Sequence, residues 1–129
     1  MVKKVLNPRK VWDSKPYVFS QGVACSGKKI IFIAGQVGIA PSGKIVSENV
    51  EAQTKQAFEN MKQVLKDAGA SMKNVAKLTV YLTDINDLPR YSEVMRTYFK
   101  RSLPAQTAVE VSRLALPELK IEIDAIAVV

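Results

Sequence analysis

Two long stretches with a helical hydrophobic period interrupt a chain that otherwise has the character of β-strands. Over about 49–68 and again over about 88–99, apolar residues recur every three or four positions and form one stripe. The predicted strands are rich in β-branched and aromatic residues or alternate in polarity, and they cover 17–25, 28–37, 75–83, 106–111 and 120–128. This order predicts an α+β fold in which two helices pack on one face of a mostly antiparallel sheet.

Turn residues separate these elements. Ser26 and Gly27 form a turn pair that predicts a hairpin between the first two strands, and Gly69 is well placed to end the first helix. The length suits one domain with a core of its own. We therefore expect a single domain over residues 1–129, in which 1–15 form an N-terminal arm and the first short strand.

The second face of such a sheet would remain uncovered in a single copy of the chain. The last predicted strand carries Ile121 and Ile123 on one face and Ile126 and Val128 on the other, so it requires apolar cover on both sides. Self-association is the economical way to bury a second apolar face. We therefore expect a homo-oligomer.

The composition removes several classes of chemistry. The 129 residues include no histidine and one cysteine, Cys25. These counts exclude Ser-His-Asp and Cys-His catalysis, histidine-ligated zinc, an internal disulfide and a cysteine metal cluster. Any chemistry must come from carboxylates, hydroxyls, amides, lysine, arginine, the single thiol or the backbone.

The formal net charge of +7 arises within residues 1–47, where eight lysines and arginines accompany one aspartate. Such a segment suits either contact with RNA or another anionic surface, or a solvated basic arm. No stretch approaches the roughly twenty apolar residues that cross a bilayer, and no apolar run follows the basic start. We expect a cytoplasmic protein without membrane contact.

Two groups of residues are candidates for chemistry on their spacing alone. Glu122 and Asp124 lie two residues apart on the last predicted strand, so their side chains share one face. Paired carboxylates can act as general acid and base, and the same spacing also suits charges at the rim of an interface. Ala34 and Gly35 lie where the second strand ends, and glycine there permits close approach of a ligand or marks a bulge.

Several motifs carry a resemblance to one family, in the order in which that family has them. They are PYVFSQGV (16–23), AGQVGIAPSGKIV (34–46), AQTKQAFENMKQVLKDAGA (52–70), VAKLTVYLTDINDLP (75–89) and PAQTAVEVSRLALPELKIEIDAIA (104–127). The chain resembles the reactive intermediate deaminase family, also called RidA or YjgF-type and once labelled translation inhibitors or endoribonucleases. The last of these motifs is the most specific.

The resemblance implies a chorismate-mutase-like fold and a homotrimer with a cleft between adjacent subunits. In active members that cleft binds 2-aminoacrylate and related enamines or imines, which pyridoxal-phosphate enzymes form from serine or threonine. Water then releases ammonia and leaves a 2-keto acid, with neither a metal nor a cofactor. The expected ligand is therefore a small carboxylate or imine in an intersubunit cleft.

The resemblance also assigns roles to residues of this chain. Glu122 matches the glutamate that orients water, and Gly35 matches the glycine after the second strand, with Ala34 where serine is frequent. Either Tyr17 or Phe19 matches the aromatic residue near the N-terminus, because two extra residues leave the choice open.

Gln106 stands where active members have the arginine that grips the substrate carboxylate. An amide cannot supply the charge or the bidentate fork of a guanidinium, so Arg101 and Arg113 are considered as replacement anchors. The resemblance therefore implies a 2-iminobutanoate/2-iminopropanoate-type deaminase in which Gln106 replaces the arginine that binds the substrate. A non-catalytic ligand-binding or regulatory trimer is the alternative, and RNA binding or translation inhibition ranks last.

Overall fold

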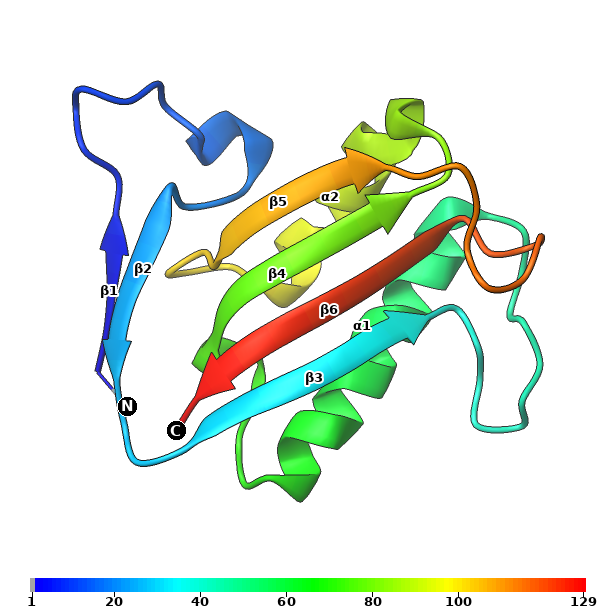
Figure 1. Ribbon diagram of the computed structural model, residues 1–129, viewed down its shortest axis with the longest axis horizontal. Coiled ribbons are helices and arrows are strands. Elements are labelled where there is room, and N and C mark those ends of the chain that lie inside the picture. Colours follow the sequence, from blue (N-terminus) through cyan, green and yellow to red (C-terminus); the bar gives the residue numbers. More distant parts are fainter. Residues whose placement is uncertain (1) are drawn as a thin grey trace.

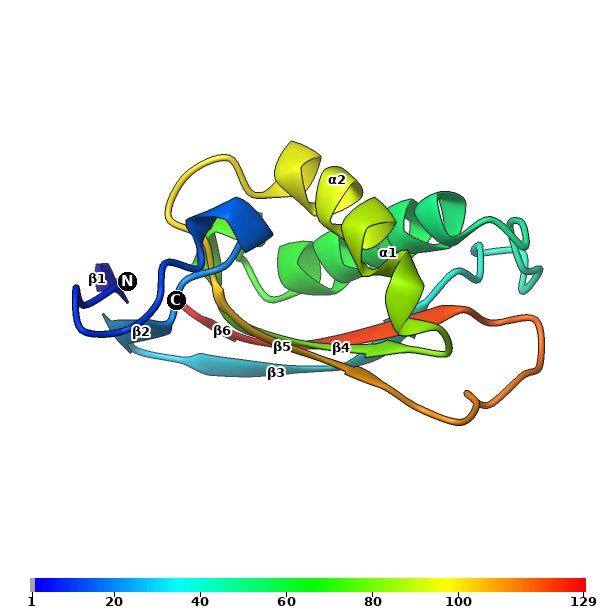
Figure 2. The same ribbon diagram turned by 90° about the horizontal axis from the view of Figure 1, so that it is seen from above.

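The computed structural model describes residues 2–129, and its centre is a four-stranded sheet with the strand order β3-β6-β4-β5 (Figure 1). β6 runs antiparallel to both β3 and β4, whereas β4 and β5 are parallel. Two helices lie together on one face of this sheet (Figure 2). The predicted α+β fold is confirmed, with elements at β3 (Ile30–Val37), α1 (Val50–Asp67), β4 (Val75–Leu82), α2 (Leu88–Tyr98), β5 (Ala105–Glu110) and β6 (Ile121–Val128).

Both helices begin and end close to the predicted positions. The side chain of Asn49 accepts a hydrogen bond from the Ala52 N–H and caps α1. After the helix, Gly69 adopts a φ of +74°, a left-handed conformation that favours glycine. The fully buried Phe58 and Leu65 lie on the inner stripe of α1. Within residues 2–129, no helix has the length and apolar character that crossing a membrane requires.

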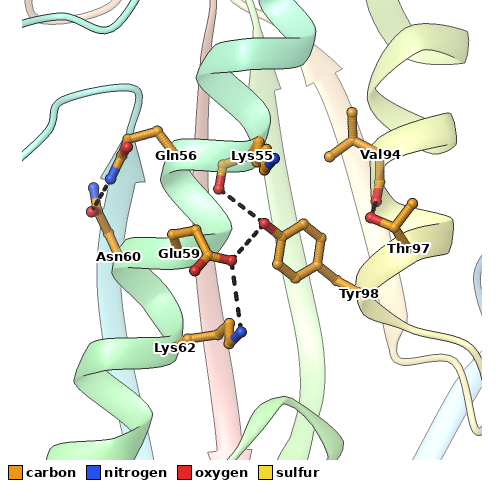
Figure 3. Close-up of polar contacts among 8 residues, drawn as sticks. All are labelled: Lys55, Gln56, Glu59, Asn60, Lys62, Val94, Thr97 and Tyr98. Atoms are coloured by element: carbon orange, nitrogen blue, oxygen red, sulfur yellow. Dashed lines mark hydrogen bonds and ion pairs between the residues drawn. The ribbon is translucent and has the colours of Figure 1, made fainter.

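Polar and aromatic contacts fix α2 against α1. The Tyr98 hydroxyl donates a hydrogen bond of 2.6 Å to the Glu59 carboxylate, which also lies 3.7 Å from the Lys62 ammonium (Figure 3). Burial and the bond to Glu59 raise the pKa of Tyr98 above its usual range. The Tyr98 ring packs on Phe58 with centroids 5.0 Å apart. α2 is therefore a firmly held element, and it carries several residues of the candidate site.

The prediction of a strand over 17–25 is wrong for its first half. Lys15–Tyr17 form a 3₁₀ turn, and only Gly22–Ser26 form a strand, β2. The predicted hairpin between β2 and β3 is also wrong, because the N-terminal strand β1 (Val2–Leu6) pairs with β2 in a separate two-stranded sheet. The basic arm thus supplies the partner that β3 was expected to provide; Met1 lies outside the described residues.

The sheet face opposite the helices is uncovered in the protomer, as the sequence predicts (Figure 2). Phe32 is 75% exposed and Ile30 is 60% exposed on β3, and the neighbouring Ile126 of β6 is 37% exposed. These three side chains form an apolar area at one end of the face. Exposed apolar area of this kind marks a surface for association.

Candidate functional site

The segment between β1 and β2 is folded against the start of β5. The Ser14 hydroxyl donates to the Phe19 carbonyl at 2.6 Å, and the Ser20 hydroxyl donates to the Leu103 carbonyl at 2.6 Å. Between them, the buried Val18 adopts a φ of 62°, which is strained for a β-branched residue. These contacts place Tyr17 and Phe19 on either side of a sharp reversal beside β5.

A pocket of about 540 Å³ lies between this segment, α2 and β5. Three aromatic side chains from the N-terminal segment form one wall: the Trp12 ring meets Tyr17 and Phe19 edge-to-face, with centroids 5.6 and 5.7 Å apart. Tyr17 is 61% exposed, so its ring presents an open face rather than a packed one. Both aromatic residues that the sequence left as alternatives therefore line the same pocket.

The opposite wall of the pocket carries polar groups. Gln106 of β5 lines it, and the buried Tyr91 hydroxyl donates a hydrogen bond of 2.5 Å to the Gln106 Oε1 atom. That bond holds the amide oxygen, and among residues 2–129 no hydrogen bond engages the amide NH₂ group, which is therefore available to donate to a ligand. α2 adds Ser92, Glu93 and Arg96 to the same wall.

We expect Tyr91→Phe to lower the free energy of unfolding by about 1 kcal/mol, because it removes the hydroxyl that orients Gln106. Tyr81→Phe is the matched control, since its hydroxyl bonds Asp124 on the open face of the sheet, outside the core. Urea denaturation of both variants measures the difference. An equal and negligible loss in the two variants would contradict this account of the Tyr91–Gln106 contact.

A second group of polar residues lies on the open face of the sheet. β3 bulges between Ile33 and Gln36, where Ala34 and Gly35 together lie opposite a single residue of β6, Asp124. A Cβ atom at Gly35 would overlap the Glu122 carboxylate and lie 2.8 Å from Glu122 Cγ. The absence of a side chain at Gly35 therefore makes room for the half-buried Glu122.

The two carboxylates on this face have different surroundings. Asp124 accepts a hydrogen bond of 3.1 Å from the Tyr81 hydroxyl, and this bond is the main cause of a raised Tyr81 pKa. Among residues 2–129, no hydrogen bond or ion pair engages the Glu122 carboxylate. Glu122 is therefore free to bind water or a ligand, whereas Asp124 is already partnered.

Gln106 and Glu122 point to opposite faces of the sheet within one protomer. Gln106 pairs with Leu78 of β4, which is fully buried beneath the helices. Glu122 pairs with Tyr81, which belongs to the alternate, open face of the same strand. Side chains of paired residues share a face, so the sheet itself separates the pocket from the Glu122 carboxylate.

The sequence profile of the Endoribonuclease L-PSP family matches residues 14–129. The chain belongs to this family, the reactive intermediate deaminases. A RutC family protein of Pyrococcus abyssi is 50% identical over 75% of this chain and 76% of its own length. The 2-iminobutanoate/2-iminopropanoate deaminase of Rattus norvegicus is 40% identical over 99% of this chain and 91% of its own.

The same family appears among solved structures. The conserved Rid-family protein YyfB of Yersinia pestis, a protein of unknown function, has a TM-score of 0.93 and 34% identity, with both chains fully covered. The chain therefore has the chorismate-mutase-like fold that its resemblance to the reactive intermediate deaminase family implied.

The structure distributes the predicted site residues of this family member over two places. Gln106, Tyr17 and Phe19 line the pocket, whereas Glu122, Gly35 and Ala34 lie together on the open face. Within residues 2–129, no group of three or more histidine, cysteine, aspartate or glutamate side chains is arranged to hold a metal ion.

Neither arginine considered as a replacement anchor lines the pocket. Arg113 borders a separate hollow, and Arg101 is exposed in the loop before β5. The arginine that does line the pocket is Arg96 of α2, which the sequence analysis did not single out. Its spacing marks it only as a polar residue of an amphipathic helix, and no sequence signal links it to Gln106.

Proposed function

We propose that the protein hydrolyses 2-imino acids, or their enamine tautomers, to 2-keto acids and ammonia at clefts between the subunits of a homotrimer. The observation that carries the proposal is the unpartnered Glu122 carboxylate beside Gly35. Two relatives that are similar to this chain over almost its whole length are named 2-iminobutanoate/2-iminopropanoate deaminases. Their names support a deaminase of the RidA type.

The separation of Gln106 from Glu122 supports a site shared by two subunits. The pocket of one subunit would meet the open sheet face of its neighbour, so that Glu122 of the partner subunit completes the site. The exposed apolar residues Phe32 and Ile30 lie on that open face and would become buried by such an association.

The proposed reaction needs only water and groups of the chain itself. The substrate lies in the pocket with its carboxylate toward the polar wall and its C=N carbon toward Glu122 of the partner subunit. Glu122 orients a water molecule and accepts its proton as the oxygen bonds to the C=N carbon. Glu122 passes that proton to the nitrogen, which gives the carbinolamine. The hydroxyl proton of the carbinolamine then moves to the nitrogen as the C–N bond breaks, so that ammonia leaves, the oxygen becomes the keto group and Glu122 is again a carboxylate.

A coupled assay tests the proposal directly. A serine or threonine dehydratase generates 2-aminoacrylate or 2-iminobutanoate, and formation of the keto acid is followed with and without the protein. We expect an acceleration above spontaneous hydrolysis that is proportional to protein concentration. If the rate equals the spontaneous rate at every concentration, the proposal is wrong and a non-catalytic ligand-binding protein is the better interpretation.

Gly35→Ala should impair turnover more than stability. The added Cβ would displace the Glu122 carboxylate, and misplacing a catalytic group by about 1 Å costs about 100-fold in rate. Because the displaced group is the end of a flexible side chain, we expect the free energy of unfolding to change by less than about 1 kcal/mol. Gly22→Ala is the matched control, since its Cβ would lie 3.6 Å from Leu6, an ordinary contact. Equal kcat values for both variants would contradict the role given to Gly35.

A further inference from the structure

Arg96 supplies a guanidinium to the pocket wall that Gln106 occupies. It extends from α2, where its Nη2 atom donates to the Pro16 carbonyl at 3.3 Å and its Nε atom lies 3.5 Å from the Glu93 carboxylate. The bond to Pro16 holds the guanidinium against the segment that carries the aromatic wall. Its remaining N–H groups are available to a ligand.

The ion pair between Arg96 and Glu93 is weak enough for a ligand carboxylate to displace Glu93. Both side chains are more than half exposed, at 51% and 74%, and exposed ion pairs of this kind contribute little. A ligand carboxylate in the pocket can therefore take the place of Glu93 on the guanidinium. Arg90, on the same helix, is already paired with Glu51 and Asp87 and does not line the pocket.

The size and walls of the pocket indicate what accompanies the carboxylate. Its volume of about 540 Å³ falls within the range of about 300–1,000 Å³ that holds ligands much larger than a four-carbon imino acid. Trp12, Tyr17 and Phe19 provide an apolar wall opposite the polar groups. Such a wall favours a branched or aromatic side chain, which buries more apolar surface against the rings.

The geometry points to Arg96 and Gln106 as a two-point anchor for the carboxylate of a 2-imino or 2-keto acid whose branched or aromatic side chain lies against Trp12, Tyr17 and Phe19. Arg96 thereby replaces the charge that Gln106 lacks, from a different element of the fold. The assignment of imino acids rests on the proposed function, whereas binding of the stable keto acid does not require turnover.

Trp12 makes this binding measurable, because it is the single tryptophan of the chain and lies in the pocket wall. The intact protein is titrated with 4-methyl-2-oxopentanoate, with 2-oxobutanoate and with 4-methyl-2-oxopentanamide, which lacks the carboxylate, while tryptophan fluorescence is recorded. We expect 4-methyl-2-oxopentanoate to bind about tenfold more tightly than 2-oxobutanoate. The amide should bind weakly.

Arg96→Gln should weaken binding of 4-methyl-2-oxopentanoate by about 10- to 100-fold and leave binding of the amide within about twofold. Arg101→Gln and Arg113→Gln are the matched controls and should leave both affinities within about twofold. Arg96→Lys should recover part of the loss, since it keeps the charge without the fork. Thermal unfolding checks that every variant is folded.

Unchanged binding of 4-methyl-2-oxopentanoate by folded Arg96→Gln would overturn the inference, as would an equal loss in all three arginine variants. The outcome is separable from that of the proposed function. Arg96-dependent binding without catalysed imine hydrolysis would leave the inference standing and remove the deaminase. Catalysed hydrolysis with an unaltered KM in Arg96→Gln would support the deaminase and overturn the role given to Arg96.

Discussion

Glu122→Gln is expected to lower kcat for imine hydrolysis by about 10²- to 10⁴-fold, the range that a positioned general base contributes. Glutamine has nearly the shape of glutamate but cannot accept a proton from water. The ligand carboxylate is held elsewhere, in the pocket on the other side of the sheet. The Kd of 4-methyl-2-oxopentanoate should therefore stay within about threefold of the original value.

Asp124→Asn provides the matched control for this substitution. Asp124 lies two residues along the same strand and the same face, but its carboxylate is bonded to the Tyr81 hydroxyl. An asparagine oxygen can still accept that bond, so kcat should fall by less than about fivefold. The coupled assay measures both variants at saturating substrate. If Asp124→Asn loses as much activity as Glu122→Gln, the assignment of separate roles to the two carboxylates is wrong.

The helices and most strands were predictable because their signals are local. The apolar stripe of α1 runs for eighteen residues between a capping asparagine and a glycine with positive φ, so pattern and end signals agree. The prediction of a strand over 17–25 was wrong for its first half because the conformation of this segment depends on contacts that are not local. Its aromatic and β-branched residues suit a strand, but hydrogen bonds from Ser14 and Ser20, the latter to a residue 83 positions away, fold it into a turn. Contacts of that range leave no periodic trace in the sequence.

The sequence predicted which residues belong to the candidate site and on which strands they lie, but it did not predict how they are arranged in space. Glu122 and Gly35 meet because a bulge in β3 brings the glycine beside the carboxylate. Whether Gln106 and Glu122 share a face depends on the register of three strands, which spacing alone does not fix. The sequence did not identify Arg96 because its place beside Gln106 depends on how α2 packs against β5. The position of an arginine on the polar face of a helix does not indicate which strand it will lie near.

The opposite orientation of Gln106 and Glu122 leads to the second large effect, which is rescue by mixing two inactive variants. Glu122→Gln keeps the pocket intact, whereas Ser92→Trp should fill the pocket from α2 and leave Glu122 in place. Each variant alone should be nearly inactive. If every site combines the pocket of one subunit with Glu122 of the partner subunit, some sites in mixed oligomers regain both functional halves.

Random assembly of equal amounts of the two variants should restore about a quarter of the original activity, because one site in four receives both intact halves in a cyclic oligomer. Co-expressed chains supply the mixed oligomers, and variants mixed after assembly supply the control, which should remain inactive. Light scattering fixes the subunit number, with an expected mass of about 43 kDa for three chains of 14.2 kDa. Activity of co-expressed variants no higher than that of either alone would mean that the pocket and Glu122 do not act across a subunit boundary. A site within one protomer would then have to bridge the sheet that separates the two, which the packed core beneath Leu78 and Ile123 does not permit.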